Sequence, residues 1–92
     1  MQSSYQKQRK ILIDKLTAWA ERLNKDIDTF KGLCVDGSTY NLLNICINKK
    51  TLSLRFTYLD ENRFIRKRSL KHSEYLTVEN DYLVIGILDE VI

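Results

Sequence analysis

The residues of this chain that could take part in catalysis are few, and they are not arranged as catalytic groups usually are. Nucleophilic catalysis needs an activated nucleophile, a base close to it and a group that orients the base. The candidates include one histidine, His72, and two cysteines, Cys34 and Cys46. His72 lies in the polar stretch Lys71-His72-Ser73-Glu74, which is typical of an exposed loop. We therefore predict no catalytic residues, and a protein that is not an enzyme.

Metal and cofactor sites also lack residues at suitable spacing. One histidine and two cysteines cannot complete a tetrahedral zinc site without carboxylates, and neither Cys-x-x-Cys nor His-x-x-x-His occurs. The three glycines are far apart, so there is no glycine-rich phosphate loop. The acid pairs Asp60-Glu61 and Asp89-Glu90 stand at turn or terminal positions, where acids are common. We expect no cofactor and no metal.

The densest chemical feature is a basic segment, residues 63–72, which contains five lysines and arginines and no acid. Side chains alternate along a strand, so Arg66 and Arg68 would share one face with Phe64. Cations beside an aromatic ring suit a sheet surface that holds phosphates and stacks a base. The same residues also suit an edge strand that its charges protect from aggregation.

Other basic residues extend this candidate surface. Residues 49–73 carry a net charge of +6 and residues 74–92 carry −5, which can place a basic face and an acidic face on one small domain. We predict that the basic face contacts nucleic acid or a nucleic-acid-bound machine, with Phe64 or Tyr58 as an apolar platform. The stretch Lys7-Gln8-Arg9-Lys10 either extends this face or is a solvated first helical turn. The candidate contact residues are Arg63, Phe64, Arg66, Lys67, Arg68, Lys71, Lys49, Lys50 and Arg55.

An acidic protein surface is the competing partner. The chain would then be a protein–protein interaction module, such as a small adaptor or an inhibitor of a larger enzyme of the kind that mobile elements encode. It would use the exposed edge strand, the acidic C-terminal end, or both. Binding to nucleic acid weakens steeply with salt, whereas binding through a packed hydrophobic patch is much less sensitive to salt.

A long amphipathic helix is expected before the strands. Apolar residues recur at steps of three and four between residues 13 and 30, and Leu12 and Trp19 widen this stripe on one side. A capping box at Ser3 and Gln6 and a C-terminal cap at Gly32 predict a helix over residues 4–31. The side chains expected to pack on the sheet are those of Leu16, Trp19, Leu23 and Ile27.

After this helix the apolar period changes to two, which indicates strands. In the first of them Leu43, Ile45 and Ile47 would share one face. The fold class is α+β, a long N-terminal amphipathic helix packed on a curled antiparallel sheet or small barrel of about five strands. The charged strand is expected at an edge and the last strand, apolar on both faces, inside the sheet. The expected strands are residues 40–47, 51–58, 63–69, 76–79 and 82–88.

The chain is expected to form a single domain over residues 1–92, since 92 residues cannot bury two cores. Its two cysteines are expected to be free thiols, and it has no signal-peptide or membrane-spanning apolar stretch. We therefore expect a cytoplasmic protein that does not bind membranes. Because the core is thin, a homodimer is a further expectation, formed through the helix flank with Leu12 and Trp19 or through an edge strand.

Overall fold

The computed structural model describes residues 4–88, and its first element is the expected long helix. Helix α1 spans Ser4–Lys25 and is followed by a short 3₁₀ helix, η1, at Ile27–Thr29. The α-helix ends before residue 31 because the backbone leaves helical geometry at Asp26, where φ is −102° and ψ is 13°. The carbonyl oxygen of Asp26 instead accepts hydrogen bonds from the N–H (2.9 Å) and the hydroxyl (2.5 Å) of Thr29. Ser3 of the capping box lies outside the described residues.

Gly32 begins a strand and does not cap the helix. It is the first residue of β1 (Gly32–Val35), which lies beside β2 (Ser38–Asn48). A Cβ atom at position 32 would lie 2.4 Å from the carbonyl oxygen of Tyr40 in β2. The close approach of the two strands therefore requires glycine here, so the expected C-cap at this position is wrong.

Six strands form one mixed sheet that is not closed, in the order β4-β3-β2-β1-β6-β5. Strand β1, which the sequence did not predict, pairs antiparallel with β2 and parallel with β6, so the sheet is not wholly antiparallel. The charged strand β4 lies at one edge and β6 lies inside the sheet, as expected. The remaining strands are β3 (Ser53–Leu59), β4 (Ile65–Ser69), β5 (Glu74–Glu79) and β6 (Tyr82–Ile87).

Two hairpins have two-residue turns with left-handed backbone geometry. Asp36 and Gly37 have φ values of 52° and 79°, and Asn80 and Asp81 have φ values of 51° and 69°. Positive φ at both central residues matches the right-handed twist of the flanking strands, and Gly, Asn and Asp tolerate it best. The turn residues therefore set the register of β1 with β2 and of β5 with β6.

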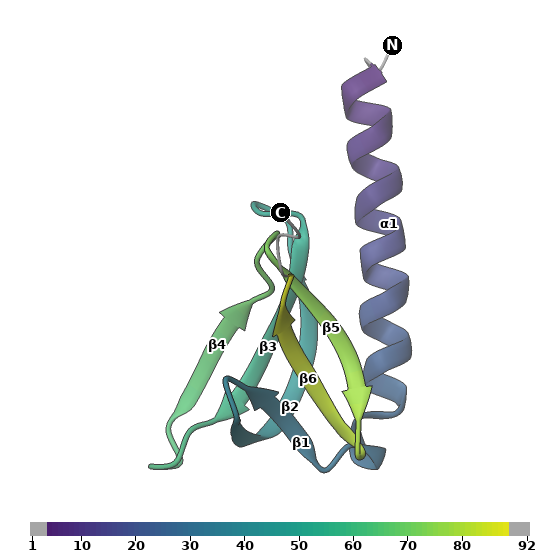
Figure 1. Cartoon of the computed structure of the whole chain (residues 1–92). Coiled ribbons are helices and arrows are strands. Elements are labelled where there is room, and N and C mark those ends of the chain that lie inside the picture. The colour runs from purple at the N-terminus through teal and green to yellow at the C-terminus, as the bar shows by residue number, and fades with distance from the viewer. Residues whose placement is uncertain (1–3, 89–92) are drawn as a thin grey trace.

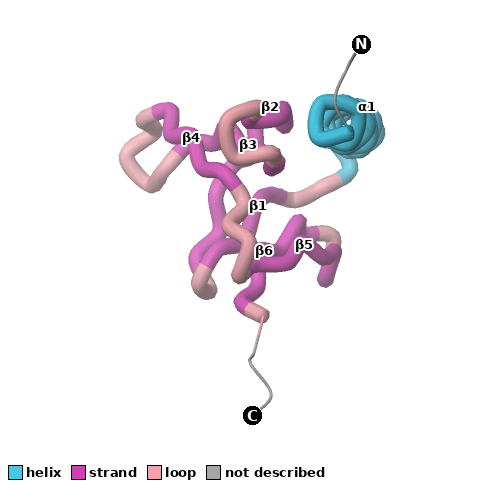
Figure 2. Tube along the Cα trace, turned by 90° about the horizontal axis from the view of Figure 1, so that it is seen from above, coloured by secondary structure: helices cyan, strands magenta, loops and turns pink. Residues whose placement is uncertain are grey.

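Strand β2 belongs to both halves of the sheet. Residues 38–40 pair with β1, and residues 41–48 pair with β3. A bulge between Leu42 and Asn44 shifts the register, so Leu42 and Ile45 are buried while Leu43 is 42% exposed. The expectation that Leu43 and Ile45 share a face is wrong, because a bulge interrupts the two-residue period. In Figure 2, β2, β3 and β4 lie on one side of β1, and β6 and β5 lie on the other.

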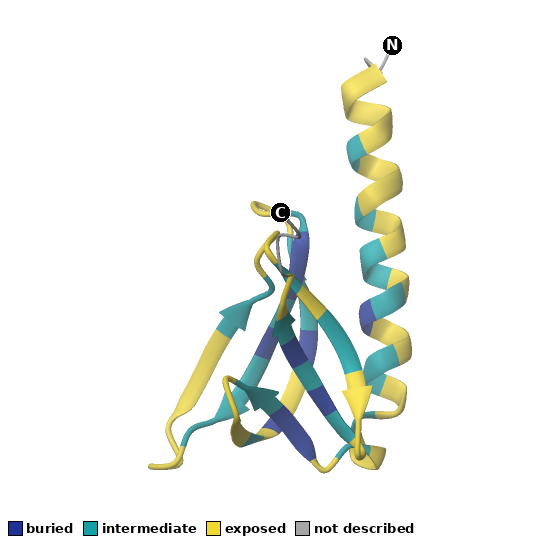
Figure 3. Cartoon of the chain, viewed as in Figure 1, coloured by how far each residue is buried: buried dark blue, intermediate teal, exposed yellow. Residues whose placement is uncertain are grey.

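The hydrophobic core is small, and α1 covers only part of it. The helix lies along β2 and also contacts β3, while its N-terminal turns project beyond the sheet (Figure 1). Ala20 is the one buried residue of α1; Trp19 and Leu23 are half-buried and pack against the core. Figure 3 shows that the first turns of α1 are almost wholly exposed. The buried core residues are Ala20, Leu33, Leu42, Ile45, Leu54, Phe56, Leu83 and Ile85.

Asn24 fastens the helix to β2. Its side-chain oxygen accepts a hydrogen bond from the N–H of Ile45 (2.9 Å), and its side-chain nitrogen donates to the carbonyl oxygen of the same residue. Strand β1 pairs with β2 only over residues 38–40. It therefore offers no hydrogen-bond partner to the backbone N–H and carbonyl oxygen of Ile45, which lie farther along β2. The asparagine amide satisfies both groups, as a neighbouring strand would.

Asn24→Ala should therefore reduce the free energy of unfolding by about 1–3 kcal/mol, since two half-buried backbone groups lose their partner. Urea unfolding followed by circular dichroism measures this. The exposed Lys25→Ala on the same turn is the control, and it should change stability by less than about 0.5 kcal/mol. Equal stability of the two variants would show that the amide contributes nothing.

Candidate nucleic-acid interface

The cations of β4 point to both sides of the sheet. Arg66 stands opposite Tyr58 and Arg68 opposite Phe56, on the side that carries the core. Lys67 stands opposite Thr57, on the side that we call the outer face. The alternation expected for Arg66, Lys67 and Arg68 is therefore confirmed. The outer face of β2, β3 and β4 carries no acid, and its residues are Asn44, Cys46, Arg55, Thr57, Leu59, Ile65, Lys67 and Ser69.

Arg66 is paired with an acid. Its Nε donates a hydrogen bond to Oδ2 of Asp60 at 2.9 Å, although 60% of the arginine side chain remains exposed. The other oxygen of Asp60 accepts from the backbone N–H groups of Phe64 and Asn62, both at 2.9 Å. The hydrogen bond from Arg66, followed by that from Phe64, lowers the pKa of the Asp60 carboxyl. Asp60 therefore organises the β3–β4 turn and holds Arg66 against it.

Arg68 is paired as well, in a less exposed place. Its guanidinium donates to Oε2 of Glu74, and the two side chains are only 21% and 8% exposed. Oε1 of Glu74 accepts from the backbone N–H of Lys71 at 2.9 Å. The hydrogen bond from Arg68 lowers the pKa of the Glu74 carboxyl against the opposing effect of burial. This ion pair closes the loop that carries the chain from the β4 edge to the β5 edge.

Neither acid was predicted from the sequence to be a partner of the basic strand. Asp60 precedes Arg66 by six residues across the β3–β4 turn, and Glu74 follows Arg68 by six residues across the next loop. Each acid lies next to β4 in the sequence. If the register of the β3–β4 hairpin had been predicted correctly, it would have placed Asp60 near Arg66. The other acid pair near the end of the chain, Asp89 and Glu90, lies outside the described residues.

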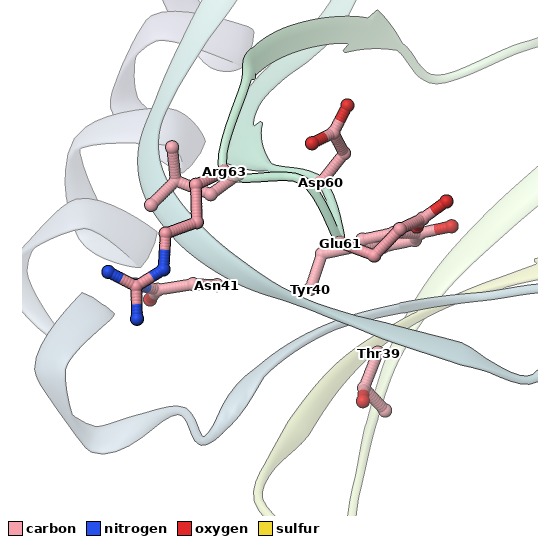
Figure 4. Close-up of a pocket in the computed structure, with 7 residues that line it drawn as sticks. Thr39, Tyr40, Asn41, Asp60, Glu61 and Arg63 are labelled. Atoms are coloured by element: carbon pink, nitrogen blue, oxygen red, sulfur yellow. The ribbon is translucent and has the colours of Figure 1, made fainter.

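Arg63 and Phe64 lie before β4, in the turn that Asp60 organises. Arg63 has a φ of 64°, and the Phe64 side chain is 62% exposed. An open cleft of about 440 Å³ borders this turn, and its lining residues are Thr39, Tyr40, Asn41, Leu59, Asp60, Glu61 and Arg63. In Figure 4 the Arg63 side chain is directed toward Asn41, whereas the carboxylate of Asp60 points the other way. Asp60 and Glu61 are both among the residues that line this cleft, and the carboxylate of Asp60 is already bound to Arg66 and to the backbone of the turn.

The opposite end of the sheet gathers cations from three segments of the chain. Arg9 of α1 donates from Nη2 to the carbonyl oxygen of Lys49 in the β2–β3 turn at 2.9 Å. Beside that turn, Asn48 donates to the hydroxyl of Ser69 at 3.1 Å, which ties the end of β4 to the end of β2. Among residues 4–88, the cations gathered here have no carboxylate within salt-bridge distance, and they are Arg9, Lys49, Lys50, Arg55, Lys67 and Lys71. We call these six residues the basic end.

The structure therefore divides the nine candidate residues. Lys49, Lys50, Arg55, Lys67 and Lys71 belong to the basic end, together with Arg9 from the N-terminal basic stretch. Arg66 and Arg68 are held in ion pairs on the core side. Arg63 and Phe64 lie at the far end of β4 from the basic end. Tyr58 lies on the core side, with its ring 5.0 Å from that of Tyr40.

The groups considered for catalysis are dispersed over the fold. His72 is exposed in the β4–β5 loop, and Cys34 and Cys46 are unpaired thiols on β1 and β2. Within residues 4–88, no group of three or more histidine, cysteine or acidic residues could hold a metal ion.

No helix within the described part of the chain is long and apolar enough to cross a membrane. Comparison of the chain with protein-family models, curated protein sequences and solved structures found no match.

The Arg68–Glu74 pair leads to a prediction about pH. Glu74→Gln should lower the free energy of unfolding at pH 7 by about 1–3 kcal/mol, because Arg68 loses a charged acceptor in a half-buried place. The folded pKa of Glu74 is lowered, so its stabilisation is complete above the unfolded value of about 4.3 and is lost as the pH falls through the folded value.

The difference between wild type and Glu74→Gln should therefore shrink between pH 7 and pH 3 in urea unfolding. Glu79→Gln, an exposed acid at the other end of β5, is the control and should show little effect at either pH. A difference that stays constant with pH would contradict an ionised Glu74 in the pair.

Proposed function

We propose that the protein is a non-catalytic nucleic-acid-binding module whose basic end contacts the phosphate backbone. The observation that carries the proposal is the set of cations at this end that have no carboxylate within salt-bridge distance among residues 4–88, and α1, the β2–β3 turn and the end of β4 supply them together. Cations that lack an internal partner are available to neutralise phosphates and to release their counterions. The free thiols at Cys34 and Cys46 support our further proposal of a reducing, cytoplasmic location.

Binding of this kind depends on charge more than on base sequence. Phosphate contacts position a protein on nucleic acid, and contacts to the bases give specificity. Phe64 lies away from the basic end, and Tyr58 packs beside Tyr40 on the core side, so neither aromatic ring expected as a platform accompanies these cations. The proposed affinity is therefore strongly salt-dependent and tolerant of sequence.

A protein partner is the second candidate, and a different surface favours it. Strand β4 is an open edge, and Ile65 and Phe64 beside it are 65% and 62% exposed. An acidic extended segment could pair with this edge and contact Lys67. Such a complex would keep most of its affinity when Lys49 and Lys50 change, and would lose it when Ile65 becomes charged.

The double variant Lys49→Glu, Lys50→Glu tests the main proposal. Both side chains are exposed in a turn, and the Arg9 hydrogen bond goes to the backbone of Lys49, so the fold should persist. For a mixed-sequence oligonucleotide, affinity should fall at least about tenfold at low salt. The slope of log K against log salt should flatten by about two, one for each lost phosphate contact.

The matched control is Lys25→Glu, Lys31→Glu, which makes the same charge change at exposed positions outside the basic end. Fluorescence anisotropy at several salt concentrations measures both variants. If both reduce affinity equally, attraction is only to net charge and the basic end is not a site. If wild type binds no oligonucleotide at low salt, the protein-partner candidate replaces this proposal.

A further inference from the structure

An exposed aromatic ring lies next to the basic end. Tyr5 belongs to the first turns of α1, and its side chain is 70% exposed. It precedes Arg9 by four residues, a spacing that places two side chains on the same side of a helix. Because Arg9 donates a hydrogen bond to the carbonyl oxygen of Lys49, this side of α1 faces the β2–β3 turn. Tyr5 therefore lies about one helical turn beyond Arg9 on the side that faces the turn.

The sheet does not extend along this part of the helix. Leu23, which packs against the core, follows Tyr5 by 18 residues, or about five helical turns, so both side chains leave α1 in the same direction. The N-terminal turns project beyond the sheet, so the side that is partly covered at Leu23 is open at Tyr5 (Figures 1 and 3). A hollow of about 440 Å³ lies along these turns, and its lining residues are Gln6, Arg9, Lys10 and Ile13.

The charges around this ring suit an anionic chain. Residues 4–13 contain three cations and no acid. Asp14, the first acid of α1, follows Tyr5 by nine residues, or about two and a half turns, so it lies on the opposite side of the helix. The hydrogen bond from Arg9 to the β2–β3 turn uses only one nitrogen of the guanidinium, which carries several N–H donors. Arg9 can therefore also donate to a phosphate oxygen.

We propose that the nucleic acid held at the basic end is single-stranded and that Tyr5 stacks on one of its bases. This inference rests on the proposed function and defines its ligand more closely. A base in an undistorted duplex is covered on both faces by its neighbours, so a side-chain ring stacks on a base that is unpaired. A groove of cations that follows the backbone, beside an aromatic ring that stacks a base, is how proteins bind single strands without sequence preference.

The order of the groups defines the path of the strand. Lys49 and Lys50 on the β2–β3 turn contact phosphates, Arg9 beside this turn contacts the next one, and the base that follows turns onto Tyr5. Because every base has a flat face, this contact adds affinity without selecting a sequence. Tyr5 thus supplies the aromatic ring that is missing from the outer face of the sheet.

Fluorescence anisotropy with labelled oligonucleotides of about 12 nucleotides tests the inference, using single-stranded DNA, single-stranded RNA and the DNA duplex of the same sequence. Tyr5→Ala should weaken single-strand binding about 5- to 150-fold and duplex binding by less than about twofold. Its slope of log K against log salt should equal that of the wild type, because no phosphate contact is lost. Tyr5→Phe keeps the ring and should bind as the wild type does. The single strand that the wild type binds more tightly identifies the ligand as DNA or RNA.

Phe64→Ala is the matched control, since its ring is 62% exposed but lies away from the basic end, and it should leave single-strand binding unchanged. Far-ultraviolet circular dichroism checks that each variant is folded; if Tyr5→Ala is not, Tyr5→Leu, which also lacks a ring, takes its place. The inference is overturned if Tyr5→Ala binds like Phe64→Ala, or if it weakens single strand and duplex equally. The proposed function survives either result as long as Lys49→Glu, Lys50→Glu reduces affinity. A wild type that binds no oligonucleotide overturns both.

Discussion

The fold depends on a single strand that has to serve two partners. Strand β2 pairs with β1 through its first residues and with β3 through the rest, and the bulge after Leu42 lets it turn from one to the other. Where β1 leaves, the backbone of Ile45 faces the helix, and Asn24 completes its hydrogen bonding. The helix is therefore fixed to the sheet by a polar contact at a strand edge as well as by the apolar contacts of Ala20 and Leu23.

The two ion pairs explain how an open sheet can carry so many cations. Arg66 and Arg68 point toward the core side of an edge strand, and each has a carboxylate. An unpaired charge would be costly at Arg68, whose side chain is only 21% exposed, whereas the Arg66 side chain is 60% exposed. Such inward charges also protect an edge strand from pairing with other chains. The cations on the outer face and at the β2–β3 turn need no such partner because water solvates them. Successive side chains of β4 point to opposite faces of the sheet. This alternation separates the cations held in ion pairs from those that can bind a ligand.

The sequence predicts much of this architecture, for identifiable reasons. The long helix and the five strands expected after residue 40 follow from local patterns, and the structure confirms these elements. Strand β1 has only four residues, and the Asp36-Gly37 turn that joins it to β2 is the one local sign of it. Its parallel pairing with β6, 50 positions away, has no local pattern that reveals it. The bulge was hidden because Leu42 and Leu43 are both apolar. For the candidate site, the high density of lysine and arginine identified the basic segment in the sequence. The strand register, however, decides which of these cations form ion pairs.

The parallel pairing of β1 with β6 has a kinetic consequence. Leu33 of β1 pairs with Leu83 of β6, so one of the first strands made is completed by the last strand made. The loop that this pairing closes spans most of the sheet, and contacts between residues so distant in the chain form slowly. During synthesis β2, β3 and β4 can pair early. The edge of β1 that pairs with β6 stays without a hydrogen-bonded neighbour until β6 is made. Folding should therefore be limited by the arrival of β6, and the buried face of Leu33 remains exposed until then.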